Sequence, residues 1–209
     1  MATSRAQFFD HLKIAAYTFD LGENRRVSET GGGELLLSDL GPRLWGGSLT
    51  VVPAAHATQR QFSAMVSLLR DGTGEFYLGD PAASNPSADP TGSMQAWMPP
   101  MALLSWAGRE ATISSTMFPL SSGDYFSFTY AGGKTGLHQV VQVQGYDWQT
   151  QAYTYLVTPS IRAGAVAGTQ VKIYHPECKA LIVPGSFRPA ENTPGTASGF
   201  SFDWRQTLK

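Results

Sequence analysis

The chain has 209 residues, of which 42% are hydrophobic and only 15% are charged, with a formal net charge of −1. An ordinary soluble domain carries about 25% charged residues, so this composition predicts a surface that is partly covered, either by copies of the chain or by a large partner. The near-zero net charge argues against nucleic acid as the main partner, because phosphate binding needs a concentrated cationic face.

The N-terminal segment, residues 1–14, contains no apolar stretch of signal-peptide length, because Asp10, His11 and Lys13 interrupt it. No part of the chain approaches the ~18 consecutive apolar residues of a membrane span. Cys178 is the single cysteine, which excludes an intrachain disulfide and a cysteine-rich zinc site. These features predict a protein made in a reducing cytosol, without a membrane span.

Residues 1–40 are interpreted as an N-terminal arm with a first strand. Tyr17, Phe19 and Leu21 alternate strictly, which is typical of a strand. The polar stretch that follows ends in three glycines, residues 31–33, and suggests either an extended arm or a flexible loop.

Residues 41–100 predict a strand–helix–strand unit with a long loop. A strand is expected over 44–52, and a helix over 54–70, where Phe62, Met65, Val66 and Leu69 recur at helical spacing. Gly72 is a plausible helix stop, and a short strand should cover 75–78. The loop over 79–100 holds five of the 13 prolines. A loop of this length usually makes functional contacts, and it marks the expected boundary between two halves.

Residues 101–209 predict an all-β half, because short strands alternate with turn residues at a spacing typical of barrels and sandwiches. The strands are expected over residues 111–118, 124–130, 137–146, 151–158, 169–175, 179–184 and 199–205. The fold class predicted for the whole chain is therefore mainly β, with one amphipathic helix packed on a sandwich or barrel and a second small barrel-like half.

No residue is assigned a catalytic, cofactor-binding or metal-binding role. His175, Glu177 and Cys178 are metal-ligand types, but the zinc-deaminase pattern they resemble needs a second cysteine. Gly133, Lys134 and Thr135 resemble the end of a phosphate loop, although the position that needs the first glycine holds Phe128 and a strand follows where a helix should. Both segments are better interpreted as a strand end and a hairpin turn.

The remaining candidate catalytic residues, two carboxylates and several serines and histidines, also lie in sequence contexts that are common in proteins without catalytic activity. Asp80 and Asp124 adjoin glycine or proline, as turn carboxylates do, but sequence alone does not exclude catalytic carboxylates. No serine lies in a nucleophile elbow, and the histidines have no obvious serine or cysteine partner for catalysis in the sequence. The residues considered were Ser48, Ser122, Ser198, His11, His56, His138 and His175.

Aromatic residues are concentrated between positions 125 and 155. They could form a sugar-binding platform, but aromatic side chains on alternating strands are more simply explained by core and interface packing. The residues are Tyr125, Phe126, Phe128, Tyr130, Tyr146, Trp148, Tyr153 and Tyr155.

Three segments together resemble tail structural proteins of long-tailed bacteriophages and prophages. The first is Trp45 to Pro81, with Ala57 and Phe62 on the helix and the run LLRDGTGEFYLGDP after it. The second is LSSGDYF, residues 120–126, followed by HQVV at 138–141 and VTPSIR at 157–162. The third runs from Phe187-Arg188 to GFSF at 199–202. The resemblance covers most of the chain after about residue 40.

The resemblance implies a distal tail or baseplate-ring component with a strand–helix–strand core of tail-tube type. Such a protein is non-enzymatic, has no cofactor, and forms a hexameric ring that joins the tail tube protein to the baseplate hub or tail-fibre proteins. It is assembled in the host cytoplasm and located in the virion. The loop 79–100 and the N-terminal arm are then candidates to reach a neighbouring copy. Two alternatives are a receptor- or glycan-binding tail component and a cell-wall hydrolase that uses Asp80 or Asp124.

Overall fold

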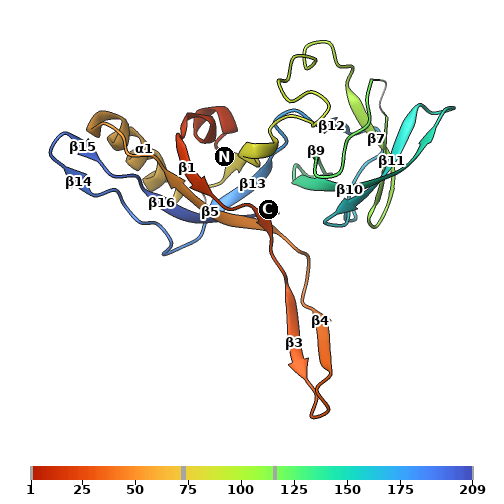
Figure 1. Ribbon diagram of the computed structural model, residues 1–209, viewed down its shortest axis with the longest axis horizontal. Helices are drawn as coiled ribbons and strands as arrows, with labels where there is room; N and C mark the ends of the chain where they lie inside the picture. The colour runs from red at the N-terminus through yellow and green to blue at the C-terminus, as the bar shows by residue number, and fades with distance from the viewer. Residues whose placement is uncertain (1, 72–73, 115–116, 209) are drawn as a thin grey trace. The chain divides into compact units, whose positions relative to one another are not determined.

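The computed structural model describes residues 2–71, 74–114 and 117–208. The chain divides into two compact units, the first formed by residues 3–76 and 180–207 and the second by residues 77–179. The second unit is therefore an insertion between two segments of the first. The fold is mainly β in both units, as the sequence predicted, and each unit is described separately below (Figure 1).

The first unit is built on a curled sheet in the order β1-β5-β16-β13-β6, with β2 also paired to β5. Its strands are β1 (Ile14–Tyr17), β2 (Asp20–Leu21), β5 (Trp45–Val51), β6 (Phe76–Leu78), β13 (Cys178–Ile182) and β16 (Ser201–Gln206). The sequence patterns predicted that residues 101–209 form one all-β half. The structure instead returns 180–207 to the first unit, because β16 pairs with β5 along five residues.

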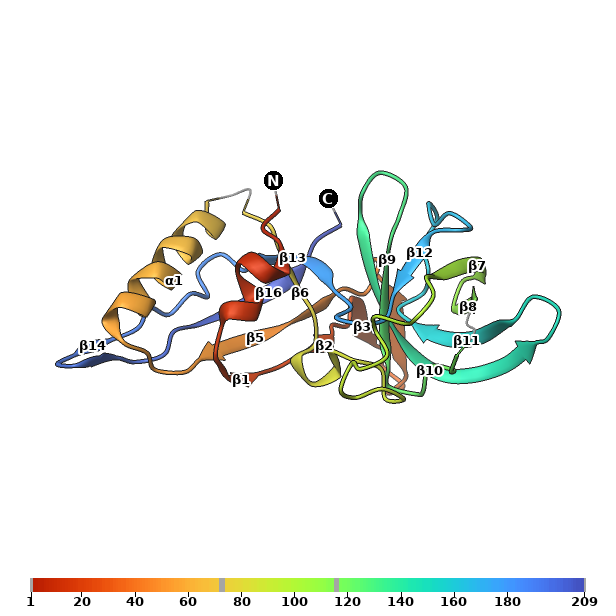
Figure 2. The ribbon, with the colours of Figure 1, turned by 90° about the horizontal axis from the view of Figure 1, so that it is seen from above.

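One face of this sheet is covered by the helix α1 (His56–Leu69) and by two short 3-10 turns, η1 (Arg5–Gln7) and η2 (Phe9–His11) (Figure 2). Phe62, Val66 and Leu69 of α1 are buried, as their helical spacing predicted. Phe62 lies against Phe200, with ring centroids 6.2 Å apart, and Phe8 packs on Phe202. Met65, predicted on the same stripe, is 36% exposed. Gly72, the expected stop, lies outside the described residues.

The stretch interpreted as an arm or flexible loop forms a β-hairpin, β3 (Arg25–Glu29) with β4 (Leu35–Asp39). All ten strand residues are exposed, and the pair is drawn as a separate two-stranded arm in Figure 1. A second, short pair of strands joins β14 (Asn192–Thr193) to β15 (Thr196–Ala197).

The second unit is a closed barrel in the order β10-β11-β8-β7-β12-β9. Its strands are β7 (Met101–Ala107), β8 (Glu110–Ser114), β9 (Tyr125–Thr129), β10 (Thr135–Asp147), β11 (Ala152–Thr158) and β12 (Gln170–Lys172). The sequence patterns predicted five of these strands but not β7. Residues 115–116 of the expected strand 111–118 lie outside the described residues. Side chains such as Leu103, Ile113 and Tyr155 fill the barrel and are fully buried.

The long loop, expected to reach a neighbouring copy, is bonded to the barrel of its own unit. It begins with the 3-10 turn η3 (Pro81–Ala83). The Asp89 carboxylate accepts hydrogen bonds from Ser93, Thr91, the Met94 amide and the Tyr174 hydroxyl, which lies 2.9 Å away. Desolvation of this buried carboxylate raises its pKa, but the hydrogen bonds together outweigh that effect and hold the pKa of Asp89 below its ordinary value. The loop is therefore a folded wall of the barrel unit.

Candidate functional site

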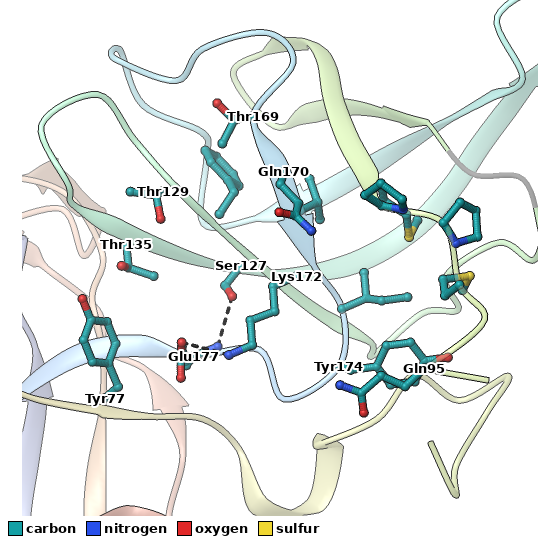
Figure 3. A pocket seen from close by; sticks show the side chains of 17 residues that line it. Tyr77, Gln95, Ser127, Thr129, Thr135, Thr169, Gln170, Lys172, Tyr174 and Glu177 are labelled. Atoms are coloured by element: carbon teal, nitrogen blue, oxygen red, sulfur yellow. Dashed lines mark hydrogen bonds and ion pairs between the residues drawn. The ribbon is translucent and has the colours of Figure 1, made fainter. Parts of the chain in front are cut away.

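A cavity of about 640 Å³ in the second unit lies on the outer face of β9 and β12 (Figure 3). Strand alternation explains why this face is polar. Phe128 and Val171 are buried in the barrel core, so their neighbours Ser127, Gln170 and Lys172 point outward. The strand register places Lys172 opposite Ser127, and Val171 opposite Phe128.

The cavity is completed by the start of β10 and by the folded loop. Thr135 of β10 is paired with Thr129 of β9, which brings two hydroxyls to one side. Gln95 and residues 98–101 come from the loop and the start of β7, and Tyr77 and Thr169 complete the lining. Figure 3 shows Tyr77 at one side of the cavity and Tyr174 with Gln95 at the other.

One ion pair lies in the cavity wall. Lys172 Nζ is 2.9 Å from Glu177 Oε1, and the Glu177 amide donates to Ser127 Oγ at 3.2 Å. The carboxylate is the more enclosed partner, with a side-chain exposure of 21% against 46% for Lys172. The pair leaves this part of the wall without net charge, so the cavity offers donors and acceptors rather than a field that selects one sign of ligand.

The metal-ligand types near the C-terminal end of β12 are not gathered into one site. Glu177 faces the cavity and pairs with Lys172, whereas Cys178 is fully buried, and burial raises the pKa of its thiol. The His175 amide donates to the Ser84 carbonyl, which ties this turn to the folded loop. Among the described residues, no group of three or more His, Cys, Asp or Glu side chains could hold a metal ion.

Five of the other candidate residues, two carboxylates, two serines and one histidine, have structural partners. Asp80 caps η3 by accepting from the Ala82 amide at 2.9 Å, and Asp124 accepts from the Ser121 amide at 2.7 Å and from Ser87. Gly133 has a positive φ in the turn between β9 and β10, where Tyr130 and Lys134 are hydrogen-bonded through their backbones. The remaining contacts are Ser48 with Thr18, Ser198 with the Glu191 amide, and His56 with the Thr193 carbonyl.

His138 is a core histidine of the barrel. Its Nδ1 lies 2.8 Å from the Pro159 carbonyl, so Nδ1 carries the proton and donates. The Tyr130 hydroxyl then donates to Nε2 at 3.1 Å. Burial between the rings of Phe126 and Phe128, reinforced by the nearby Arg162 charge, lowers the pKa of His138 to about 4, against the opposing effect of the Pro159 hydrogen bond. The ring is therefore neutral at physiological pH.

The eight aromatic residues considered as a sugar platform do not form one surface. Four of them are at most 8% exposed and belong to the barrel core: Phe126, Phe128, Tyr130 and Tyr155. Tyr125, the neighbour of Phe126 on β9, is 7% exposed. The other three gather near the turn between β10 and β11. There the Tyr146 ring lies 4.8 Å from that of Trp148 and 4.5 Å from that of Tyr153, and Trp148 is 84% exposed.

The chain matches no known protein family, and no characterised protein matches it in sequence. No helix in the described ranges is long and apolar enough to cross a bilayer.

Proposed function

We propose that the protein is a non-enzymatic structural component of a phage tail tip, which forms a ring between the tail tube and the baseplate hub or tail fibres. Support comes from the three resembling segments, from the scarcity of charged residues, and above all from the β3–β4 hairpin. On this proposal the ring is a hexamer, and the protein acts in the virion after assembly in the host cytoplasm.

The hairpin carries the proposal because one of its faces bears an uncovered apolar strip. Cross-strand register pairs Val27 with Leu37 and Glu29 with Leu35, and directly paired residues share a face. Val27, Leu35 and Leu37 therefore form one apolar strip, and they are 58%, 65% and 59% exposed. Exposed apolar strips of this kind are typical of protein interaction sites.

The opposite face and the base of the hairpin carry more polar and charged residues than the apolar strip. Arg26, Ser28 and Ser38 alternate with the strip and so lie on the other face, together with Leu36. Arg25 pairs with Asp39 at 2.7 Å beside the strip. Covering each strip residue would contribute about 1–2 kcal/mol of gross hydrophobic free energy. A ring multiplies that gain over all its interfaces, because head-to-tail contacts give every copy the same two complementary surfaces.

The test is the oligomeric state of the purified chain, measured by analytical ultracentrifugation and by negative-stain electron microscopy. We expect the wild type to form closed rings at high concentration. The double variant Val27→Lys, Leu37→Lys should be monomeric with an unchanged melting temperature, because both side chains are exposed in the monomer. The matched control Ser28→Lys, Ser38→Lys, on the other face, should still assemble. A wild type that remains a monomer at all accessible concentrations would refute the proposal.

A further inference from the structure

One side of the cavity on β9 and β12 is lined by polar side chains that lie outside the barrel core. Barrel packing uses the inward side chains, such as Phe128 and Val171. Outward side chains of β9, β10 and β12, with one residue before β12 and one from the folded loop, instead present hydroxyl and amide groups to the cavity: Ser127, Thr129, Thr135, Gln170, Thr169 and Gln95. Hydroxyls both donate and accept, and a side-chain amide offers both kinds of group at fixed spacing. This lining suits a ligand that is itself rich in hydroxyl groups.

The charge of the cavity narrows the class of ligand further. Lys172 and Glu177 are the charged side chains of the lining, and they neutralise each other at 2.9 Å. A phosphate-bearing ligand would require an excess of cationic groups, and a carboxylate ligand would meet the Glu177 charge. A neutral ligand meets neither obstacle. The ammonium and the carboxylate can also contact adjacent hydroxyls, one by donating and the other by accepting.

The apolar parts of the lining complement the weakly polar faces of sugar rings. Tyr77 presents an aromatic ring with a polar end, and Met98, Pro99 and Pro100 form an apolar wall from the folded loop. The volume of about 640 Å³ is in the range of sites that enclose small ligands. Small β-barrels use outer strand faces of this kind for oligosaccharides.

We propose that this cavity binds a neutral oligosaccharide, with the outward polar row of β9 and β12 contacting its hydroxyls and Tyr77 packing against a ring face. This is a second activity, independent of ring formation, and it locates a sugar site away from the exposed aromatic group at Trp148. Gln170 and Lys172 point outward from β12 and are exposed, so they can contact a ligand without reorganising the barrel.

The experiment is a titration of the isotope-labelled full chain, followed by the shifts of its backbone amide signals. The probes are trisaccharides of glucose, galactose, mannose and N-acetylglucosamine, with inorganic phosphate and a short oligothymidylate as charged comparisons. We expect at least one trisaccharide to shift the amides of Ser127, Gln170, Lys172 and Glu177, and neither charged probe to do so. Absence of shifts with all four trisaccharides would overturn the proposal, as would shifts confined to the residues around Trp148.

Two variants locate the site. Gln170→Trp should reduce the affinity at least about tenfold by filling the cavity, whereas the matched control Gln149→Trp, an exposed position in the β10–β11 turn, should bind like the wild type. If Gln170→Trp does not fold, Lys172→Met keeps the apolar stem, removes the donor, and should weaken binding as well. Unchanged affinity in the folded cavity variant would overturn the proposal. Ring formation is measured separately, so failure of one proposal leaves the other standing.

Discussion

Acidification should destabilise the barrel through His138. The imidazole is enclosed by Phe126 and Phe128, donates from Nδ1 to the Pro159 carbonyl, and accepts from the Tyr130 hydroxyl. A second proton would place a charge in the barrel core, near the cationic Arg162. Burial holds the pKa of His138 at about 4, against an ordinary value of 6.5. In the unfolded chain, by contrast, the ring is hydrated and takes up the proton readily.

The sign and size of the effect follow from these two pKa values. Above pH 6.5 His138 is neutral in both the folded and the unfolded chain, so its full contribution to the free energy of unfolding is present. As the pH falls below 6.5 the unfolded state binds the proton while the folded state does not, and stability is lost until the folded pKa near 4 is passed. The total loss of stability on full acidification is on the order of 3 kcal/mol, since each unit of difference between the two pKa values corresponds to about 1.4 kcal/mol. About 2 kcal/mol of it should be lost between about pH 7.5 and pH 5.

Urea denaturation of the wild type and of His138→Gln, followed by circular dichroism across this pH range, isolates the histidine. Glutamine keeps a donor and an acceptor but does not titrate, so all other ionisable groups contribute equally to both proteins. The free energy of unfolding of the wild type should fall by about 2 kcal/mol more than that of the variant. Parallel pH profiles would refute the reasoning, and so would a directly measured imidazole pKa near its ordinary value.

Three further outcomes concern packing. Phe62→Ala should lower the free energy of unfolding by about 3–5 kcal/mol, whereas Leu68→Ala, on the exposed side of the same helix, should change it by less than about 0.5 kcal/mol; equal melting shifts would contradict the assigned helix face. Tyr174→Phe should lower the free energy of unfolding by about 1–3 kcal/mol and speed proteolysis within the folded loop, whereas the control Tyr146→Phe should not. An unchanged digestion pattern would argue against the Tyr174–Asp89 hydrogen bond as the anchor of the loop. Deleting residues 82–95 should destabilise the barrel in a thermal melt, because the deletion removes Asp89. A barrel of wild-type stability would show that the Asp89 contacts do not support it.

The local patterns in the sequence predicted the fold class well. The spacing of Phe62, Val66 and Leu69 identified the helix and its buried face, because helical periodicity reflects burial directly. The β3–β4 hairpin was missed because its strands bury nothing within the chain, although the Thr30–Gly33 segment between two extended runs is a turn signal. The return of β16 to the first sheet was also missed, since strand pairing across more than 150 residues leaves no mark on local periodicity.

The cavity was less accessible to sequence reasoning. In the sequence, Thr135 and Glu177 belong to segments that resemble a phosphate loop and a zinc-deaminase motif, neither of which is complete. No pattern in the sequence marks Ser127, Gln170 or Lys172 as site residues. Ser127 and Lys172 come together only through the register of β9 with β12, and Glu177 lies in the connection that follows β12. For the aromatic residues, period-two alternation correctly predicted core packing in most cases. It did not predict that Trp148 is exposed while Tyr155 is buried.

The insertion of one unit into the other has a consequence for how such a chain can change. The barrel leaves the first sheet at β6 and re-enters it at β13, and these two strands are neighbours in that sheet. Neighbouring strands lie roughly 5 Å apart, so a foreign domain with closely spaced ends could replace residues 79–177 at a single pair of junctions. Evolution, or an engineer, could thereby exchange the second unit while the β3–β4 hairpin of the first unit stays the same.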